Sequence, residues 1–98
     1  MQLIVYDGSF EGFLSAVFDI YEHRYDHVEF SNDEHYQSTI FGAAHIVATD
    51  EAKTKRVWQG LKQKLSAAGL SNVYKTFLSE KQGIEVILLY YIRYVFTS

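Results

Sequence analysis

The sequence lacks cysteine and proline altogether. Without cysteine the chain forms no disulfide, offers no thiolate nucleophile and cannot bind zinc through sulfur. Proline-rich linkers, repeats and low-complexity stretches are also absent, so nothing marks a boundary between domains. Because chains usually divide into domains only above ~250 residues, the sequence predicts a single domain over residues 1–98.

A long hydrophobic run is missing as well. The longest apolar stretch, "VILLYYI" at residues 86–92, is followed by Arg93 and is far shorter than the ~20 residues that span a bilayer. The first residues carry neither the charged region nor the small-residue cleavage site of a signal peptide. We therefore expect a cytoplasmic protein that makes no membrane contact.

Aromatic residues, in contrast, are plentiful. Eight Tyr and seven Phe contribute to an aromatic share of 16% and a hydrophobic share of 48%. This apolar mass can offset the conformational entropy lost when so short a chain folds. The composition therefore predicts an ordered domain with one modest core.

The charges are distributed unevenly along the chain. Residues 1–51 hold ten acidic residues and one basic residue, a net charge of −9, whereas residues 52–98 hold eight basic and two acidic residues, a net charge of +6. If the two halves fold against each other, the asymmetry is internal complementarity, which is the arrangement we favour. If they form separate faces, the basic face could attract an anionic partner.

Strand and helix signals alternate through the first half of the chain. The β-branched stretch "QLIVY" at residues 2–6 ends at an Asp-Gly pair and predicts a buried strand. Ser9 is suited to cap a following helix, whose apolar residues recur at helical spacing through Tyr21. Two further strands are predicted within "HVEFS" at 27–31 and "AHIVAT" at 44–49.

Helical signals dominate the second half. Thr49 or Asp50 is expected to cap a helix that runs to about residue 68 and stops at Gly69. A shorter helix is predicted over residues 70–80, with Val73, Phe77 and Leu78 facing inward. Ser79 and Gln82 have capping-box spacing and predict a last helix from about residue 84. The fold class is therefore α+β, a small sheet of about three strands packed against about four helices.

The last predicted helix is apolar nearly all round. Only Glu85 and Arg93 are charged in "IEVILLYYIRYVFTS" at residues 84–98. A helix of this kind must be covered on several sides, so we expect either a homo-oligomer or a further C-terminal region that covers it. The residues predicted to form this interface are Leu89, Tyr90, Ile92, Tyr94 and Phe96.

The stretch "YDGSFEG" at residues 6–12 raises the question of a phosphate-binding loop. The glycine spacing fits neither a P-loop nor a dinucleotide fingerprint, and Asp7 and Glu11 place negative charge where an anion would bind. Ser9 is not in a nucleophile elbow. We interpret the stretch as a structural corner, with Gly8 at positive φ and Gly12 allowing close packing.

Histidines offer little support for a metal site. His23 and His27 are four residues apart, but no glutamate completes an H-E-x-x-H motif, and His35 and His45 form no second cluster. We predict surface or helix-terminal histidines, no metal and no cofactor. No pair of residues has the spacing of a nucleophile with its base or of an acid with its base, so catalysis is left open.

A basic segment surrounds the single tryptophan, Trp58. A basic helix with an aromatic side chain could bind a nucleic-acid backbone, and the alternative is a solvated helix face with Trp58 in the core. The cations that would make the nucleic-acid contact are Lys53, Lys55, Arg56, Lys62 and Lys64.

Three blocks, "YDGSFEGFLSAVFDIY", "IVATDEAKTKRVWQGLKQKLS" and "VYKTFLSEKQGIEVILLYYIR", together resemble a bacterial family described as probable DNA metabolism proteins. Members of that family are encoded beside a radical SAM protein, their presumed partner, and related chains are fused to a uracil-DNA glycosylase-like domain. Typical members are more than twice as long. The resemblance therefore implies that this chain corresponds to their N-terminal part.

The resemblance also implies a function and a set of polar residues. It implies an accessory domain in DNA metabolism or repair that contacts nucleic acid and a radical SAM partner. The alternative is a protein-interaction or dimerisation module without nucleic-acid contact. The matching polar residues, which are not needed to fill the core, are Asp7, Ser9, Glu11, Ser79, Glu80 and Arg93.

Overall fold

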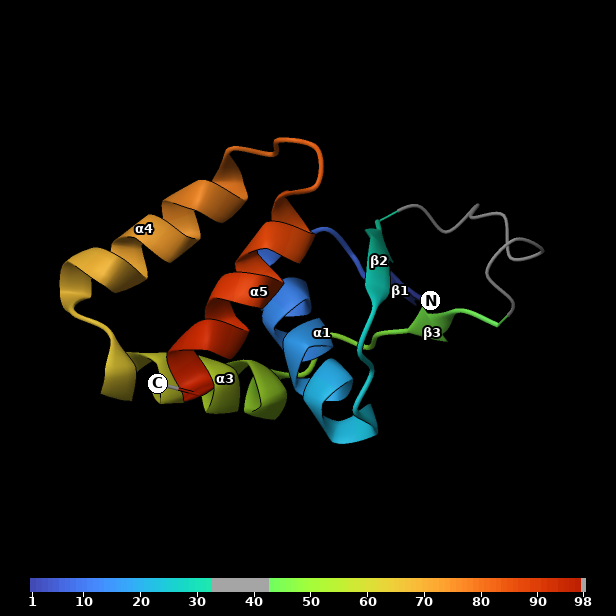
Figure 1. Ribbon diagram of the computed structural model, residues 1–98, viewed down its shortest axis with the longest axis horizontal. Coiled ribbons are helices and arrows are strands. Elements are labelled where there is room, and N and C mark those ends of the chain that lie inside the picture. Colours follow the sequence, from blue (N-terminus) through green and yellow to red (C-terminus); the bar gives the residue numbers. More distant parts are fainter. Residues whose placement is uncertain (33–42, 98) are drawn as a thin grey trace.

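The computed structural model describes residues 1–32 and 43–97, which form the expected α+β domain (Figure 1). Three strands and four helices are present in these residues. The elements are β1 (Gln2–Val5), α1 (Phe10–His23), β2 (Val28–Ser31), β3 (His45–Ile46), α3 (Glu51–Lys64), α4 (Ala67–Leu78) and α5 (Ile84–Thr97).

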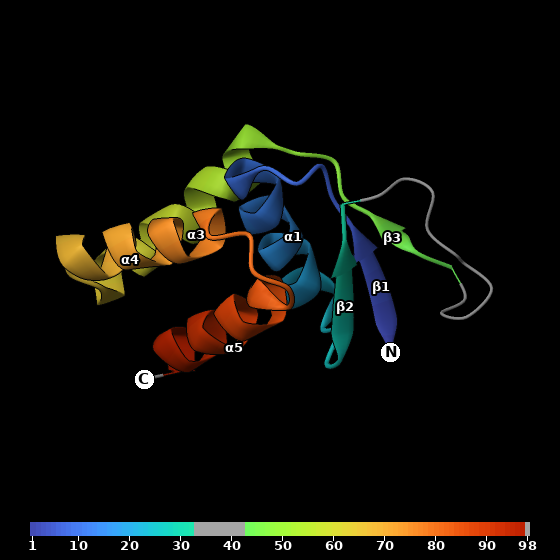
Figure 2. The same ribbon diagram turned by 90° about the horizontal axis from the view of Figure 1, so that it is seen from above.

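The sheet is parallel and has the strand order β2-β1-β3. Ile4 at the centre of β1 is paired with Phe30 of β2 on one side and with His45 of β3 on the other. A parallel pair needs a crossover connection, and α1 provides it between β1 and β2. Figure 2 shows all four helices on one side of the sheet, with α4 farthest from it.

Phe13 of α1 is completely buried where the helices meet the sheet. Its ring lies 5.6 Å from that of Phe30 on β2 and 5.2 Å from that of Phe77 on α4. Tyr6, which directly follows β1, contacts Phe13 and Phe30 with edge-on rings. Such aromatic pairs contribute ~0.5–1.5 kcal/mol each beyond the area they bury, so these rings join the sheet to the helices.

The start of α1 and the start of α3 agree with the sequence. Ser9 caps α1 by accepting a hydrogen bond from the Gly12 N–H, and Asp50 caps α3 by accepting one from the Lys53 N–H. Each cap satisfies a backbone donor that has no partner within its helix.

The predicted long helix to residue 68 is wrong. α3 ends at Lys64, Leu65 is extended, and Ser66 caps α4 by accepting a hydrogen bond from the Gly69 N–H. Gly69 therefore lies in the first turn of α4 and does not stop α3. The break at Leu65 redirects the chain, which allows Val73 and Phe77 of α4 to reach the core.

The predicted capping box between Ser79 and Gln82 is also wrong. Ser79 closes α4 instead, and its hydroxyl donates to the Thr76 carbonyl. Glu80 and Gly83 then adopt positive φ angles of 54° and 80°, which reverse the chain before α5. Leu78 was expected to face inward, but the turn leaves it 53% exposed.

Helix α5 is covered on one face only. Its buried residues are Ile84, Leu88, Leu89, Ile92 and Val95, and its exposed apolar residues are Ile87, Tyr90, Tyr91 and Tyr94. Leu89 and Ile92, which the sequence placed in an interface, therefore belong to the core. Among the described residues, no helix has both the length and the apolar character needed to cross a membrane.

We predict that Gly12→Ala destabilises the domain by about 1–3 kcal/mol. A Cβ at Gly12 would lie 2.1 Å from Oδ1 of Asp7, so the turn between β1 and α1 would have to shift. The free energy of unfolding in urea measures the loss.

Gly69→Ala is the matched control, because Gly69 has the same position after its capping serine but a Cβ there meets ordinary contacts at 3.4 Å and beyond. The control should gain about 0.5–1 kcal/mol, as alanine in a helix usually does relative to glycine. Equal stability changes in the two variants would contradict the tight corner at Gly12.

Candidate functional site

The stretch at residues 6–12 forms a closed corner. Oδ1 of Asp7 accepts hydrogen bonds from the Ser9 N–H at 2.9 Å and the Ser9 hydroxyl at 2.6 Å. Oδ2 of Asp7 accepts one from the Thr49 hydroxyl at 2.7 Å. These hydrogen bonds, from the Ser9 and Thr49 side chains above all, lower the pKa of Asp7 below its usual value. The polar groups of Asp7 and Ser9 are thus engaged within the fold itself.

The other predicted motif residues are dispersed. Glu11 is exposed on the first turn of α1, and its carbonyl accepts a hydrogen bond from the Thr54 hydroxyl. Arg93 of α5 donates to the carbonyls of Tyr25 and Asp26, so it fastens α5 to the turn between α1 and β2. Among these six residues, Asp7 and Ser9 lie together in the corner, Ser79 and Glu80 are adjacent in the turn after α4, and Ser9 and Glu80 line one hollow.

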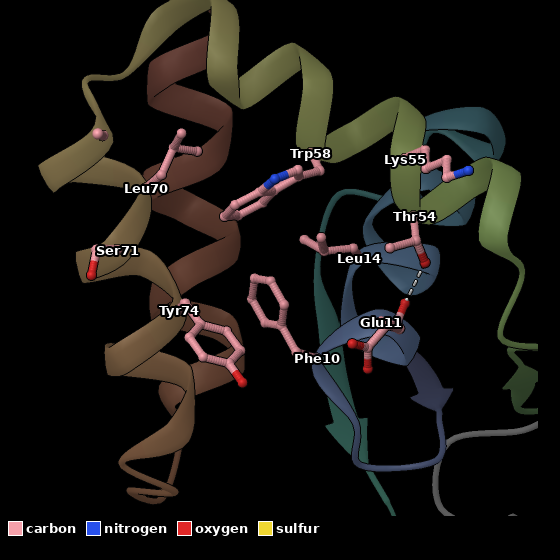
Figure 3. Close-up of a pocket in the computed structure, with 10 residues that line it drawn as sticks. Phe10, Glu11, Leu14, Thr54, Lys55, Trp58, Leu70, Ser71 and Tyr74 are labelled. Atoms are coloured by element: carbon pink, nitrogen blue, oxygen red, sulfur yellow. Dashed lines mark hydrogen bonds between the residues drawn. The ribbon is translucent and has the colours of Figure 1, made fainter.

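A cleft opens between α1, α3 and α4, with a volume of about 610 Å³ (Figure 3). Phe10 of α1 lies between Trp58 of α3 and Tyr74 of α4, with ring centroids 5.7 Å and 5.1 Å away. Tyr74 is 44% exposed, whereas Trp58 and Phe10 are half-buried. The cleft therefore presents aromatic surface to a ligand; the sequence analysis missed it, because three separate helices build it.

The basic residues of α3 do not form a single surface. Lys53 is bound to Asp19 at 2.7 Å, and Arg56 lines a different hollow with Phe18 and Phe96. Lys64, at the C-terminal end of α3, is exposed.

Lys55 and Lys62, in contrast, lie on either side of Trp58 along the helix. Lys55 precedes Trp58 by three residues and Lys62 follows it by four, a spacing that places all three on one helix face. Lys55 also lines the cleft and forms an exposed ion pair with Glu51 at 2.9 Å. Exposed pairs of this kind are worth at most ~1 kcal/mol, so a phosphate could replace Glu51.

A buried ionic cluster connects α1, β3 and α3, and the sequence analysis did not identify it. Asp19 of α1 is 5% exposed and accepts hydrogen bonds from Lys53 Nζ at 2.7 Å and His45 Nε2 at 2.9 Å. The Tyr25 hydroxyl lies 3.2 Å from Nδ1 of His45. Helical spacing places Asp19 on the side of α1 opposite the apolar stripe that contains Leu14, so the sequence carries no local signal for its burial.

The electrostatics of this cluster favour an ionised Asp19. Burial alone would raise the pKa of Asp19, but the hydrogen bonds and charges of Lys53 and His45 outweigh burial and lower it below the usual value. The pKa of Lys53 is raised in turn, chiefly by its hydrogen bond to Asp19. Both oxygens of Asp19 are occupied by these partners, so the cluster holds three elements together and leaves no lone carboxylate for chemistry.

The histidines give no metal centre within the described residues, where no group of three or more potential ligands is close enough together to hold an ion. His23 and His45 are in ring contact at 4.9 Å, whereas His27 ends the turn before β2 and its carbonyl accepts a hydrogen bond from the Gln2 N–H. His35 lies outside the described residues.

A second candidate surface is the exposed side of α5. Tyr90 is 53% exposed and Tyr94 is 66% exposed, as the predicted interface requires. Phe96 is half-buried, and its ring packs 5.9 Å from that of Tyr21. Ile87 and Tyr91, which are not among the five residues of the predicted interface, extend the apolar surface.

Comparison with known proteins identifies no relative: no family model, no curated protein and no solved structure matches the chain.

We predict that Asp19→Asn lowers the free energy of unfolding at neutral pH by about 1.5–3 kcal/mol, the usual contribution of a hydrogen bond to a charged group. The change leaves the charge of Lys53 without its ionised partner, and the Lys53 side chain is only one third exposed. Urea denaturation at pH 7 measures the loss.

The same variant should also change the pH dependence of stability. Because the folded pKa of Asp19 is depressed, its contribution is present above the ordinary carboxyl pKa of ~4 and is lost as the pH falls through the lower folded value. Asp19→Asn should therefore flatten the stability curve below about pH 4. The slope that remains comes from groups such as Asp7, whose pKa is also lowered. If the free energy of unfolding fell with pH below about pH 4 as steeply as in the unmodified chain, the ionised pair would be contradicted.

Proposed function

We propose that this domain is a nucleic-acid-binding accessory domain that contacts a single strand through the cleft between α1, α3 and α4. The observation that carries the proposal is the row of Lys55, Trp58 and Lys62 on one face of α3, of which Lys55 and Trp58 line the cleft. Single-stranded nucleic acids are bound by aromatic side chains that stack on bases and by cations that contact phosphates. This row supplies both kinds of group on one helix face.

The dimensions of the cleft support a base as the ligand. Its volume of about 610 Å³ is within the range of pockets that take small planar molecules. The exposed ring of Tyr74 faces the cleft opposite Trp58, with Phe10 between them. A base that stacks on Tyr74 would leave its phosphates near α3, where Lys55 and Lys62 lie.

The resemblance to probable DNA metabolism proteins gives this proposal its biological setting. The domain would then act in DNA metabolism or repair in a bacterial cytoplasm, together with a radical SAM protein. Its own contribution would be to hold the strand. All three blocks that carry the resemblance contain cleft residues, with Phe10 in the first, Trp58 in the second and Tyr74 in the third.

Trp58 is the single tryptophan, so its fluorescence reports on the cleft alone. We expect a short oligothymidylate at low salt to quench this fluorescence in a saturable manner. Tyr74→Ala should weaken binding about tenfold, because stacking is worth ~1–3 kcal/mol per base. Fluorescence that does not respond to the oligonucleotide, with the protein folded, would overturn the proposed function.

The salt dependence tests the two cations separately from the rings. The double variant Lys55→Gln with Lys62→Gln should reduce the slope of log affinity against log salt by about 1.4, because each single-strand phosphate that a cation neutralises adds ~0.7 to it. Arg56→Gln is the matched control, because Arg56 belongs to the same helix but lines a different hollow. If the slope of log affinity against log salt were equal in the double variant and in the control, the assignment of Lys55 and Lys62 to the phosphates would be contradicted.

A second candidate function is self-association through α5. Its exposed face combines Ile87, Tyr90, Tyr91 and Tyr94, and no charged residue occurs between Glu85 and Arg93. Figure 2 shows α5 at the edge of the helical layer, so a second copy can approach it. Two such faces meet without like-charge repulsion, which favours a second copy of this chain as the occupant.

Light scattering over a range of concentrations tests this candidate. We expect a dimer for the unmodified chain and a folded monomer for Tyr90→Glu, because the new carboxylate would be buried without a partner. Tyr74→Glu places the same charge on an exposed tyrosine of α4 and should remain dimeric. A folded chain that stays monomeric at every concentration would exclude self-association.

A further inference from the structure

A second hollow, of about 480 Å³, lies beyond the cleft at the carboxyl ends of β1 and β2. Segments far apart in the sequence form it: the corner after β1, the end of β2 and the turn between α4 and α5. Ligand sites of parallel sheets usually lie at this edge. Its charged side chains are two carboxylates, Glu80 and Glu85, and one cation, Lys81. We call this hollow the carboxyl-edge pocket.

Glu85 is held in a fixed position in the carboxyl-edge pocket. The hydroxyl of Tyr6 donates a hydrogen bond to Oε2 of Glu85 at 2.7 Å, and Tyr6 is only 5% exposed. Burial, and after it the hydrogen bond to Glu85, raises the pKa of Tyr6. The phenol therefore remains protonated and keeps donating, so Glu85 presents an oriented carboxylate whose oxygens can accept further hydrogen bonds.

Aromatic rings supply the remaining wall of the pocket. Phe10, Phe30 and Phe77 line it together with Tyr6. A cation that lies against such rings is attracted by their negative faces, by ~0.5–2 kcal/mol according to its desolvation. The pocket therefore combines an oriented carboxylate, a second carboxylate at the exposed Glu80 and aromatic surface.

We propose that the carboxyl-edge pocket binds a guanidinium group, supplied by an arginine side chain of a partner protein. A guanidinium is planar, remains charged and presents a fork of N–H donors that matches a carboxylate, whereas its flat face suits aromatic rings. The two carboxylates repel phosphate, so this pocket is separate from the nucleic-acid contact. The inference goes beyond the proposed function and does not depend on it.

Titration of the intact chain with agmatine, followed by amide NMR shifts, tests the proposal directly. We expect saturable shifts at Gly8, Gly83 and Glu85, and about tenfold weaker binding of n-butylamine, which carries a charge but no planar fork. Glu85→Gln should weaken agmatine binding about tenfold, since it removes the charge-assisted hydrogen bonds. Glu80→Gln, at an exposed position that cannot disturb the core, should weaken it less.

Glu22→Gln is the matched control, because it removes an exposed carboxylate on α1 outside the pocket and should leave agmatine binding unchanged. The absence of saturable shifts in the pocket would overturn the proposal. So would equal binding of butylamine, or unchanged agmatine affinity in both folded glutamate variants. None of these outcomes bears on the oligonucleotide titration, which reports on Trp58.

Blocked Gly-Arg-Gly and Gly-Lys-Gly peptides identify the source of the guanidinium. Tighter binding of the arginine peptide than of agmatine supports a partner protein, because the peptide adds contacts outside the pocket. Tighter binding of agmatine would overturn the partner protein as the source and assign the pocket to a small guanidine.

Discussion

The carboxylate of Asp7 is the constraint on which the arrangement of the helices depends. It accepts hydrogen bonds from Ser9, which caps α1, and from Thr49, which lies just before α3. One side chain thus fixes the positions of both helix starts relative to β1. Gly12 allows this approach because a Cβ would occupy the position of the carboxylate. The corner therefore helps to fix α1 and α3, two of the three helices that form the cleft.

The buried carboxylate of Asp19, paired with Lys53, also joins α1 to α3. Asp19 belongs to the acidic half of the sequence and Lys53 to the basic half, so the pair is a direct instance of the complementarity that the uneven charges suggested. Lys53 is consequently engaged within the domain. The basic surface that remains near Trp58 is formed by Lys55 and Lys62, which are separated by two helical turns.

Local signals in the sequence were sufficient to predict the strands and the helix caps at Ser9 and Asp50, because each of these features depends on residues only a few positions apart. The break at Leu65 was missed because Ser66 caps α4 from within a stretch whose spacing also suits one long helix. The pairing of Asp19 with His45 and Lys53, the aromatic cleft and the carboxyl-edge pocket depend on tertiary contacts between distant segments. Helical periodicity cannot reveal such contacts.

Phe10 forms a wall of both the aromatic cleft and the carboxyl-edge pocket. A rotation of this ring that widened one of them would alter the shape of the other, so ligands bound at the two proposed sites would be coupled through a single side chain. Such coupling is reciprocal: a ligand that favours one ring orientation changes the affinity at the second location by the same factor in both directions. The domain would thereby let two bound molecules that never touch influence each other's affinity.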